Sequence, residues 1–530
     1  MNGMSTLTAF LDAHASGAPA LFDRDRPVTY AALADEAVRL AAGLRSIGIR
    51  AGDRVALWLP NLPAWLATFF ACGRLGAIAV SVNTRFRGYE VQDIVSRAGC
   101  KAIVFWPGFR NIDFAGILAE CDPGALSVLA HAVAYAEGDE RIPEHVHGKP
   151  VIAYRALIGS GLLREDVGRP ESGCVIFTTS GTTKAPKFVL HDQRTVLRHA
   201  HDVALAFGYE APDTRVLVTA PLCGVFGFAN AMGALAAAAP IVMFPTFDAG
   251  ESAQAVLRHG VTHTHASDEM IGRMLEAVPG VPAFPSARFF GYASFSPAYA
   301  DLPKRAEARG LTIVGLYGMS EVQALMARQS EAAPLAERTL AGGRCIAPEA
   351  RVRARDVESG VTQAHGVAGE LEFKVPSCMV GYFGDEAETR AAFTADGYLR
   401  TGDLGYSTAE NAFVFLTRLG DAFRLGGFLV NPAEIEDVLE THPSVAAAQV
   451  VGVETAAGTK AFAFVIVKPG ERFDESALTG YCAARIAKFK VPVRVQPIDA
   501  FPVTPGSNAT KIQKAKLREL AQAFLVRSNQ

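Results

Sequence analysis

Short apolar runs alternate with longer amphipathic segments through the first half of the chain, and this alternation restricts the fold more than any other feature of the sequence. Residues 30–44 place apolar side chains at helical spacing, and the run at residues 54–59, which follows Gly52 and Asp53, predicts a buried strand. The same texture continues at residues 63–74, 77–82 and 101–105. Strands that alternate with helices form parallel sheets covered by helices, so the sequence predicts an α/β fold.

The length and the charge balance narrow the class of protein. With 530 residues the chain exceeds what one hydrophobic core usually serves, so we expect at least two domains. Its 51 Lys and Arg residues nearly balance 54 Asp and Glu residues, which leaves a formal net charge of -3. A dedicated nucleic-acid-binding protein would show a strong basic excess, and the composition argues against that class.

The texture changes after Tyr382 to short strand candidates and tight turns. Farther on, the pattern predicts a helix at residues 432–441, strands at 446–453 and 461–467, a helix at 474–487 and a strand at 493–498. These elements form a compact α+β module of about 110 residues, a common domain size. We place the boundary at Gly420, which divides the chain into domains at residues 1–419 and 420–530.

Charge is distributed unevenly along the chain. Residues 485–530 carry nine Lys and Arg residues against Asp499 and Glu519, a local charge of +7, so the rest of the chain carries -10. Two interpretations stay open: a solvated face of a C-terminal helix, or an edge that attracts phosphate groups.

Cysteine usage and the N-terminus predict a cytoplasmic protein. The eight cysteines are scattered without a CxxC pair, which favours reduced thiols over a disulfide framework or a zinc ribbon. The N-terminus has neither a basic region nor an uninterrupted apolar stretch, so it does not resemble a signal peptide. The uncharged residues 216–247 are long enough to cross a membrane, but proline, glycine and asparagine interrupt them, and we expect a buried strand, helix and strand with no transmembrane segment.

A buried strand candidate runs into a turn rich in hydroxyl groups at residues 174–187, with the sequence CVIFTTSGTTKAPK. Successive backbone N–H groups, hydroxyls and lysine ammonium groups can hold a phosphate there. The turn does not match GxxxxGK[ST], so a P-loop nucleotide hydrolase is excluded.

This segment resembles the phosphate-loop signature of the adenylate-forming superfamily, which includes acyl-CoA synthetases, peptide-synthetase adenylation domains and luciferases. The family pattern is approximately T-S-G-T-T-G-x-P-K-G, and here Lys184 and Phe188 replace two of its glycines. The resemblance implies that six residues hold the β- and γ-phosphates of ATP: Thr179, Ser180, Gly181, Thr182, Thr183 and Lys187.

Further motifs follow in the order of that family. The sequence YGMSE at residues 317–321 resembles Y-G-x-[ST]-E, which implies that Tyr317 stacks on adenine, Ser320 meets the α-phosphate and Glu321 holds Mg²⁺. The sequence YLRTGD at residues 398–403 and the sequence RLGD at residues 418–421 imply that Asp403 and Arg418 bind the ribose. Gly420 occupies the family's hinge position.

The last motifs concern thioester formation and the catalytic lysine. Gly426 and Gly427 resemble the paired glycines that line the tunnel for the pantetheine arm of CoA. Lys511 aligns with the lysine that bridges the carboxylate and the α-phosphate, with Lys514 and Lys516 as nearby rivals.

The acyl pocket is expected near residues 221–227, 264–270 and 290–295, with Gly224, Phe226, His265 and Gly291 as lining residues. Gly224 stands where many relatives carry a histidine or aromatic gate, so we hypothesise a more open acyl cavity. The mainly apolar segments favour a medium-chain, cyclic or aromatic acid, and His265, Asp268 and Glu269 leave room for a polar substituent. The histidine pairs 199/201 and 263/265 lack a third ligand, which favours core or surface positions over a metal site.

Together the resemblance implies a large N-terminal domain of stacked α/β sheets plus a distorted β-barrel, with a small mobile α+β C-terminal domain. It implies an AMP-forming carboxylic acid–CoA ligase that uses ATP, Mg²⁺ and CoA, with a role in fatty acid metabolism. No carrier domain follows Lys511, which favours free CoA as the acceptor. An enzyme that loads a separate carrier protein and a catalytically silent nucleotide-binding homologue stay open as alternatives, as does a homodimer.

Overall fold

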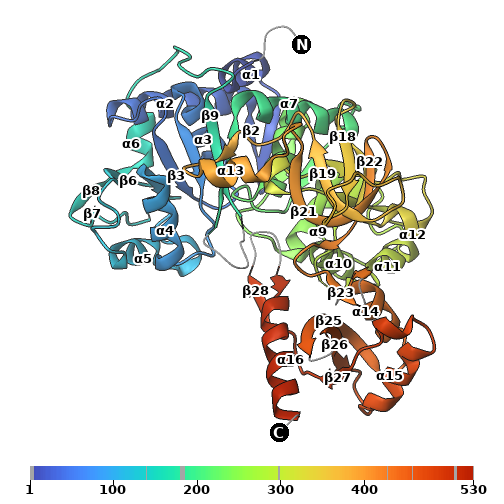
Figure 1. Cartoon of the computed structure of the whole chain (residues 1–530). Coiled ribbons are helices and arrows are strands. Elements are labelled where there is room, and N and C mark those ends of the chain that lie inside the picture. Colours follow the sequence, from blue (N-terminus) through green and yellow to red (C-terminus); the bar gives the residue numbers. More distant parts are fainter. Residues whose placement is uncertain are drawn as a thin grey trace.

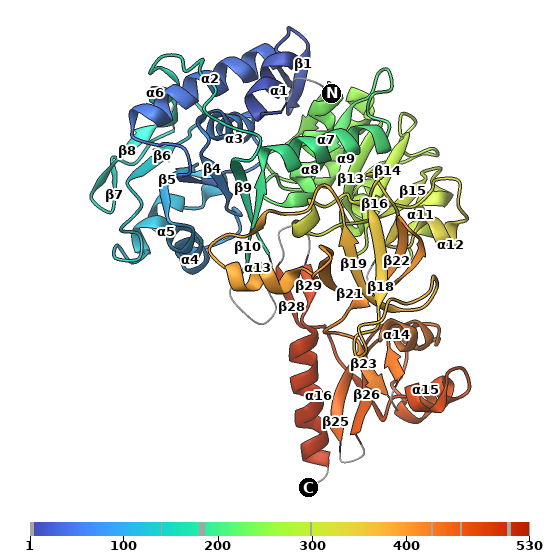
Figure 2. The ribbon, with the colours of Figure 1, turned by 45° about the horizontal axis from the view of Figure 1, so that its top comes forward.

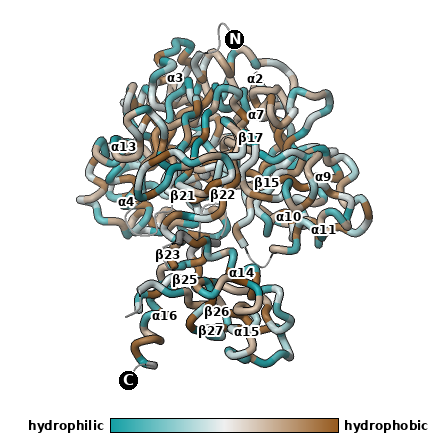
Figure 3. The backbone as a smooth tube through the Cα atoms, turned by 45° about the vertical axis from the view of Figure 1, so that its right-hand side comes forward, coloured by the Kyte–Doolittle hydropathy of each residue, from teal (hydrophilic) through white to brown (hydrophobic). Residues whose placement is uncertain are grey.

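The protein has a large body and a smaller module at its C-terminal end (Figure 1). The computed structural model describes residues 5–138, 140–179, 186–296, 299–425, 428–455, 458–505 and 510–528. In all three views of the whole chain the module lies to one side of the body, with β23 (Phe423–Leu425) between them (Figures 1, 2 and 3).

The first sheet of the body has nine strands in the order β20-β10-β9-β4-β3-β5-β6-β8-β7. Its central strands pair in parallel, as the alternation of strands and helices predicts. The strands are β3 (Arg54–Trp58), β4 (Ile78–Ser81), β5 (Cys100–Phe105), β6 (His131–Ala134), β7 (His145–Val146), β8 (Lys149–Ala153), β9 (Gly173–Thr178), β10 (Phe188–Asp192) and β20 (Gly381–Tyr382).

The helices of this half follow the predicted pattern. The segment predicted at residues 30–44 is α2 (Tyr30–Ser46), whose Thr29 side chain caps the helix by accepting from Ala32 N. α3 (Pro63–Leu75) begins with proline and is buried along its whole length; Gly76 ends it with φ 67°, a conformation that favours glycine. The other helices are α1 (Leu7–His14), α4 (Gly88–Ala98), α5 (Phe114–Glu120) and α6 (Tyr154–Ile158).

The second sheet has thirteen strands in the order β18-β19-β21-β22-β17-β16-β15-β14-β13-β11-β12-β1-β2. The segment from β15 to β1 pairs in parallel, and the segment from β15 to β18 is antiparallel. The strands are β1 (Pro19–Asp23), β2 (Arg26–Thr29), β11 (Val216–Val218), β12 (Ile241–Met243), β13 (His263–Ser267), β14 (Phe289–Ala293), β15 (Ile313–Tyr317), β16 (Ala327–Arg328), β17 (Gly342–Cys345), β18 (Arg351–Arg355), β19 (Gly369–Lys374), β21 (Leu399–Ala409) and β22 (Ala412–Arg418).

Two strand pairings in the body join distant parts of the sequence. β1 pairs in parallel with β12, and β20 pairs antiparallel with β10 at the edge of the first sheet. The remaining helices of the body are α7 (Gln193–Ala206), α8 (Val225–Ala236), α9 (Ala249–His259), α10 (Asp268–Glu276), α11 (Leu302–Ala308), α12 (Leu335–Arg338) and α13 (Glu386–Ala392).

The uncharged residues 216–247 form β11, α8 and β12, so the prediction of a buried strand, helix and strand is confirmed. α8 is buried from Val225 to Leu235, and its Phe228 packs against Phe177 of β9 and Phe69 of α3. Within the described ranges, the helices are too short or too polar to cross a membrane.

The C-terminal module contains the five predicted elements and five more. Its elements are β23, β24 (Phe428–Val430), α14 (Ala433–Glu440), β25 (Val445–Thr455), β26 (Gly458–Val467), α15 (Glu475–Ala483), β27 (Arg494–Pro497), β28 (Val503–Pro505), β29 (Thr510–Ile512) and α16 (Lys514–Ser528). The helix predicted at 474–487 is shorter, because the chain turns at Lys488–Lys490 ahead of Pro492. The hairpin of β28 and β29 was not predicted, because Pro502 and Pro505 weaken the strand pattern of this segment.

The module has its own apolar clusters. One cluster gathers around Ile435, Val450 and Ala463, and the other joins Phe462 to Leu517. Both draw only on residues after Gly420. A module with its own core can turn as a unit, and the boundary at Gly420 stays a prediction.

Candidate active site

The base of the hydroxyl-rich turn is a pair of antiparallel strands. Thr179 N donates to Lys187 O at 3.0 Å, and Lys187 N donates to Thr179 Oγ1 at 3.2 Å, just beyond the register pair Thr178 and Phe188. The ends of the turn are therefore fixed to the first sheet. Ser180, Gly181, Thr182 and Thr183 lie outside the described residues, so their predicted phosphate contacts stay predictions.

Glu321 lies in a short turn, Ser320–Val322, directly after β15. Its side chain is buried, and the Tyr382 hydroxyl donates to its Oε1 at 2.9 Å. Burial, with the Glu321 carboxylate beside the ring, raises the pKa of Tyr382, so the hydroxyl keeps its proton. The other carboxylate oxygen of Glu321 takes part in no hydrogen bond with the described residues. A hard, oxygen-ligated cation such as Mg²⁺ fits this donor when a nucleotide supplies the remaining oxygens.

Lys187 lies on the same tyrosine. Its Nζ is 4.6 Å from the centre of the Tyr382 ring and forms an ion pair with Glu388 of α13. One aromatic side chain therefore contacts both the residue predicted to hold phosphate and the residue predicted to hold the metal.

His191 supports the backbone of the Ser320–Val322 turn from β10. Its Nε2 lies 2.8 Å from Ser320 O, and burial lowers the pKa of His191 to about 4. The ring is therefore neutral near pH 7, with Nε2–H donating to the carbonyl. Neither His191 nor Tyr382 was predicted, because each lies far from Ser320 and Glu321 in the sequence.

Tyr317, Asp403 and Arg418 come together where β15 ends beside the antiparallel strands. The Tyr317 hydroxyl donates to Asp403 Oδ2, and Arg418 Nη1 lies 2.8 Å from Asp403 Oδ1, which is its register partner across β21 and β22. Burial raises the pKa of Asp403, an effect that the Arg418 guanidinium opposes. Despite the ion pair, Asp403 Oδ1 accepts no hydrogen bond from the described residues, so it keeps acceptor capacity for a ligand hydroxyl.

The Tyr317 ring has aromatic neighbours on several sides. It packs against Phe373, Phe413 and Phe415, with ring centres 5.0 to 5.6 Å apart. This packing and the bond to Asp403 fix the orientation of the ring, and its stacking on adenine stays a prediction.

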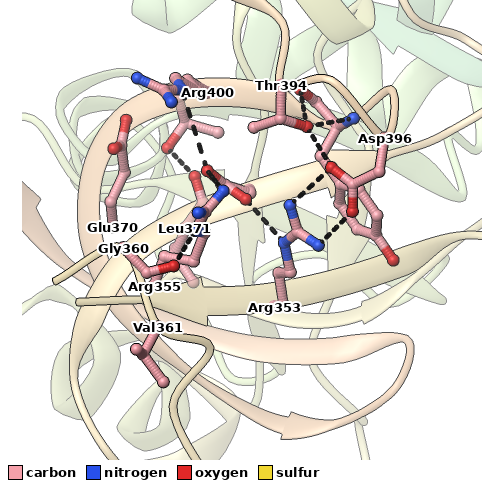
Figure 4. A network of polar contacts seen from close by, with 12 residues as sticks. Arg353, Arg355, Gly360, Val361, Glu370, Leu371, Thr394, Asp396 and Arg400 are labelled. Atoms are coloured by element: carbon pink, nitrogen blue, oxygen red, sulfur yellow. Dashed lines mark hydrogen bonds and ion pairs between the residues drawn. The ribbon is translucent and has the colours of Figure 1, made fainter. Parts of the chain in front are cut away.

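A polar network on β18, β19 and β21 holds the strand that carries Asp403. Arg353 pairs with the buried Glu372 at 2.6 Å, and Figure 4 shows its guanidinium pointing at Asp396. A surface cavity of about 400 Å³ lies beside these residues and Arg400.

The turn before Asp403 is fixed by three hydrogen bonds. Thr401 Oγ1 donates to Leu371 O at 2.6 Å, Asp403 N donates to Thr401 Oγ1 at 3.0 Å, and Gly402 N donates to Glu370 Oε1 at 3.2 Å. The position of Asp403 is thus set by the sheet before any ligand arrives.

The predicted hinge follows Arg418 directly. Leu419 N donates to Gly402 O at 2.8 Å, and Arg518 of α16 donates to Gly420 O at 2.6 Å and to Asp421 Oδ1 at 3.0 Å. A Cβ at Gly420 would meet no atom within 4 Å, so packing in this conformation does not require glycine there. The role of Gly420 as a hinge stays a prediction.

Gly426 and Gly427 lie outside the described residues, between β23 and β24. The backbone of Lys511 belongs to β29, opposite Thr504, while its side chain is outside the described part of the structure. The β28–β29 hairpin lies at the end of α16 that faces the body (Figures 1 and 2). Of the two rivals, Lys514 has its Nζ 2.8 Å from Glu436 Oε1 in a largely buried pair. The assignment of Lys511 stays a prediction.

The predicted acyl-pocket residues lie on β13, β14 and α8. Gly224 precedes the first turn of α8, and Phe226 is buried within that helix. His265 and Gly291 are register partners, and a Cβ at Gly291 would come within 2.5 Å of His265 Nδ1. Gly291 is therefore a glycine because the imidazole occupies the space above it.

His265 begins a buried chain of polar groups. Its Nε2 lies 2.7 Å from the Tyr209 hydroxyl, which donates to Asn230 Oδ1 at 2.6 Å. Burial lowers the pKa of His265 well below its usual value, so the ring is neutral, with Nε2–H donating to Tyr209. Phe207 covers the ring at 4.4 Å between centres.

Asp268 and Glu269 have partners within the protein other than a substrate. Asp268 accepts from the backbone N–H groups of Glu269, Phe295 and Ser296 at 2.7 to 2.8 Å. Glu269 pairs with Arg273 on an exposed face of α10. The histidines at 199, 263 and 265 are buried, and the described residues contain no group of three metal-binding side chains.

Family comparisons cover most of the chain. The model of the AMP-binding enzyme family matches residues 9–383, and that of the AMP-binding enzyme C-terminal domain matches residues 434–507. A ligase of Mycobacterium tuberculosis named 3-[(3aS,4S,7aS)-7a-methyl-1,5-dioxo-octahydro-1H-inden-4-yl]propanoyl:CoA ligase is 31% identical over 98% of this chain and 100% of its own length. The human mitochondrial medium-chain acyl-CoA ligase ACSF2 is 27% identical over 94% of this chain and 84% of its own.

Solved structures share the fold. ATP-bound MatB from Rhodopseudomonas palustris superposes with a TM-score of 0.82 at 23% identity, covering 98% of this chain and 99% of that protein. The o-succinylbenzoate CoA synthetase of Bacillus subtilis, solved with its acyl-adenylate intermediate, gives 0.77 at 25% identity over 96% and 97% of the two chains.

Proposed function

Because the chain belongs to the AMP-binding enzyme family and is an ATP-dependent acid–CoA ligase, we propose that its substrate is an apolar carboxylic acid of medium size that carries an alicyclic ring. The enzyme forms an acyl-adenylate from the acid and ATP and releases pyrophosphate. The thiol of CoA then displaces AMP and gives the acyl-CoA. Adenylation is needed because a carboxylate has no good leaving group at neutral pH, whereas AMP leaves readily.

The observation that carries the substrate class is the neutral, enclosed chain of His265, Tyr209 and Asn230 beside Gly291. His265 stays neutral and supplies no charge to a second carboxylate. The nearby Arg328 lies over the Phe289 ring and pairs with Glu331. The engagement of Asp268 and Glu269 also supports an apolar acid. Among the relatives, the name of one refers to a propanoyl group on an indene ring system and that of another to medium-chain acids.

The substrate proposal is tested in a thioester assay with a panel of acids. We expect 3-cyclohexylpropanoate and octanoate to be converted, with the ring-bearing acid giving the higher kcat/KM. Malonate and succinate should be poor substrates, because burying an unpaired carboxylate is costly. A preference for a dicarboxylate would overturn the proposal.

The proposed residue roles rest on the contacts above. Glu321 binds Mg²⁺ through the carboxylate oxygen that Tyr382 leaves free, and the metal neutralises charge on the triphosphate. Asp403 accepts from a ribose hydroxyl through Oδ1, and Arg418 binds beside it. Lys187 and the hydroxyl-rich turn hold the β- and γ-phosphates.

The remaining roles belong to the module. Lys511 orients the carboxylate and stabilises the charge that develops during adenylation, which is how selective binding accelerates a step. The module then turns about Gly420 and brings Gly426 and Gly427 to the site for thioester formation. The independent core of the module supports such a turn.

We also propose a cytoplasmic enzyme of fatty acid metabolism. The eight cysteines are free thiols, as expected in a reducing compartment. Cell fractionation checks the location, and an organellar enzyme would contradict it. Sedimentation equilibrium tests the alternative of a homodimer, which a monomer mass would reject.

A further inference from the structure

Tyr382 lies between two groups that the reaction needs, and it comes from a distant part of the chain. Its strand, β20, adds to the edge of the first sheet beside β10, so the residue is brought to the base of the hydroxyl-rich turn. Its backbone N–H donates to Thr389 Oγ1 at 2.8 Å, which ties the residue to α13. The ring is therefore held by a sheet on one side and a helix on the other.

The hydroxyl of Tyr382 fixes one oxygen of Glu321. The bond of 2.9 Å is buried, and Met379 N donates to the backbone carbonyl of Glu321 at 2.7 Å. Ser377 Oγ donates to Val322 O at 3.2 Å and adds a further tie between the same two segments. The Glu321 carboxylate is thus oriented, with its other oxygen left for a ligand.

The face of Tyr382 supports Lys187. The ammonium lies 4.6 Å from the ring centre, within the range of a cation–π contact, and Glu388 holds it from the far side. The Tyr382 ring and Glu388 together hold the Lys187 ammonium.

We propose that Tyr382 is a positioning residue for adenylation, which orients Glu321 for metal binding through its hydroxyl and holds Lys187 for phosphate binding through its ring. The proposal rests on the role of Glu321 stated above. The hydroxyl and the ring of Tyr382 thus have different functions, and the hydroxyl can be removed while the ring is kept.

The first test measures binding of a non-hydrolysable ATP analogue by calorimetry at increasing Mg²⁺ concentrations. Tyr382→Phe removes the hydroxyl but keeps the ring, so the Mg²⁺ needed for half-maximal binding should rise about tenfold, as expected for a hydrogen bond to a charged group. Affinity for the analogue without Mg²⁺ should not change. Tyr382→Leu also removes the ring and should weaken binding without Mg²⁺ as well.

Tyr154→Phe is the matched control. Tyr154 is buried and its hydroxyl donates to Glu36 Oε1 at 2.7 Å, so the change removes the same kind of bond elsewhere in the body. It should lower the melting temperature and leave the Mg²⁺ dependence of binding unchanged. An unchanged Mg²⁺ dependence in Tyr382→Phe, with only a loss of stability like that of the control, would overturn the proposal.

Two further variants keep the outcome decisive. If Tyr382→Phe does not fold, Thr389→Val removes the hydroxyl that accepts from Tyr382 N and should shift the Mg²⁺ dependence in the same direction. No shift counts against the proposal. Glu321→Gln tests the proposed function separately. If Glu321→Gln leaves the Mg²⁺ dependence intact, the metal role of Glu321 fails; if it changes while Tyr382→Phe does nothing, only the role of Tyr382 fails.

Discussion

Asp403 combines burial, an ion pair and an acceptor oxygen that no described hydrogen bond uses. The carboxylate is 1% exposed, and its two neighbours, Tyr317 and Arg418, come from different strands. Burial raises the pKa of the Asp403 carboxyl, and the Arg418 guanidinium opposes that rise. The residue is therefore prepared to accept a hydroxyl from a ligand.

Changing Asp403→Asn should weaken ATP binding. The amide keeps the size of the side chain but removes the charge that holds Arg418 and accepts strongly from a hydroxyl, so the Kd for ATP should rise about tenfold or more. Calorimetry measures the change. The affinity for pyrophosphate serves as the control, since it has no ribose, and an equal loss for both ligands would argue against a ribose contact.

The buried His263 makes the stability of the protein depend on pH. Burial, with Arg288 adding repulsion, lowers the pKa of this histidine to about 4 from its ordinary 6.5. Between those pH values the unfolded chain binds more protons than the folded one, so the free energy of unfolding falls as the pH drops from about 6.5 to about 4. The loss from this group is at most roughly 3 kcal/mol.

Urea unfolding at pH 7 and pH 5 measures this effect, with His263→Gln for comparison. The variant removes one titrating group, so its stability should decline less between the two pH values. An identical decline in both proteins would show that His263 does not contribute.

The sequence predicted the residues of the site that lie in contiguous motifs, and missed those that reach it through tertiary pairing. Glu321 and Asp403 are recognisable because neighbouring residues form patterns. Tyr382 lies 61 positions from Glu321, and only the pairing of β20 with β10 brings it near. In the sequence, His191 looks like an ordinary strand residue, because its neighbours give no sign of its contact with the carbonyl of Ser320.

At the scale of elements, α16 forms the link between the end of the chain and the predicted hinge. Arg518 in the second turn of this helix donates to Gly420 O and pairs with Asp421, while Leu517 packs into the module. The helix therefore holds the segment that must change its dihedral angles if the module turns.

Arg518→Met should release that segment. The change keeps an unbranched apolar stem but removes both polar contacts, so limited proteolysis at residues 419–422 should become faster. Arg527→Met, near the end of the same helix, is the control and should leave the rate unchanged. Equal cleavage rates in all three proteins would show that Arg518 does not restrain the hinge.

Local patterns predicted five elements of the module, but they missed the end of α15 and the β28–β29 hairpin. α14, β25 and β26 follow the expected segments within a few residues because their apolar periodicity is strong. α15 ends early because the following turn competes with the helix, and a pattern of apolar residues does not register that competition. The β28–β29 hairpin was missed because its strands are short and because proline, which occurs at 502 and 505, is not typical of strands.

At the scale of the whole molecule, much of the basic charge of residues 485–530 is neutralised within the module. Lys490 pairs with Glu434, Arg494 with Glu475, and Lys514 with Glu436. These acidic residues precede the basic segment in the sequence, so charge counted along the chain overstates the field around the module. These ion pairs give a structural role to a large part of the local charge of +7. Lys511 remains the lysine proposed for the reaction.

Lys511→Ala should separate the two half-reactions. Adenylation should be abolished, because the charge that develops on the carboxylate and the α-phosphate loses its partner. Thioester formation from supplied acyl-AMP should persist, since the proposed turn of the module moves Lys511 away. ATP–pyrophosphate exchange measures the first half and release of AMP on addition of CoA measures the second; equal loss of both would contradict the division of labour.

The pairing of β20 with β10 also has a consequence during synthesis on the ribosome. β10 ends at Asp192, yet the strand that covers its edge begins only at Gly381, so nearly the whole body must be made before the first sheet is complete. Until then an apolar edge strand is open to pairing with other nascent chains. A truncated product that stops before Gly381 would therefore tend to aggregate, and it would also leave Glu321 without its tyrosine.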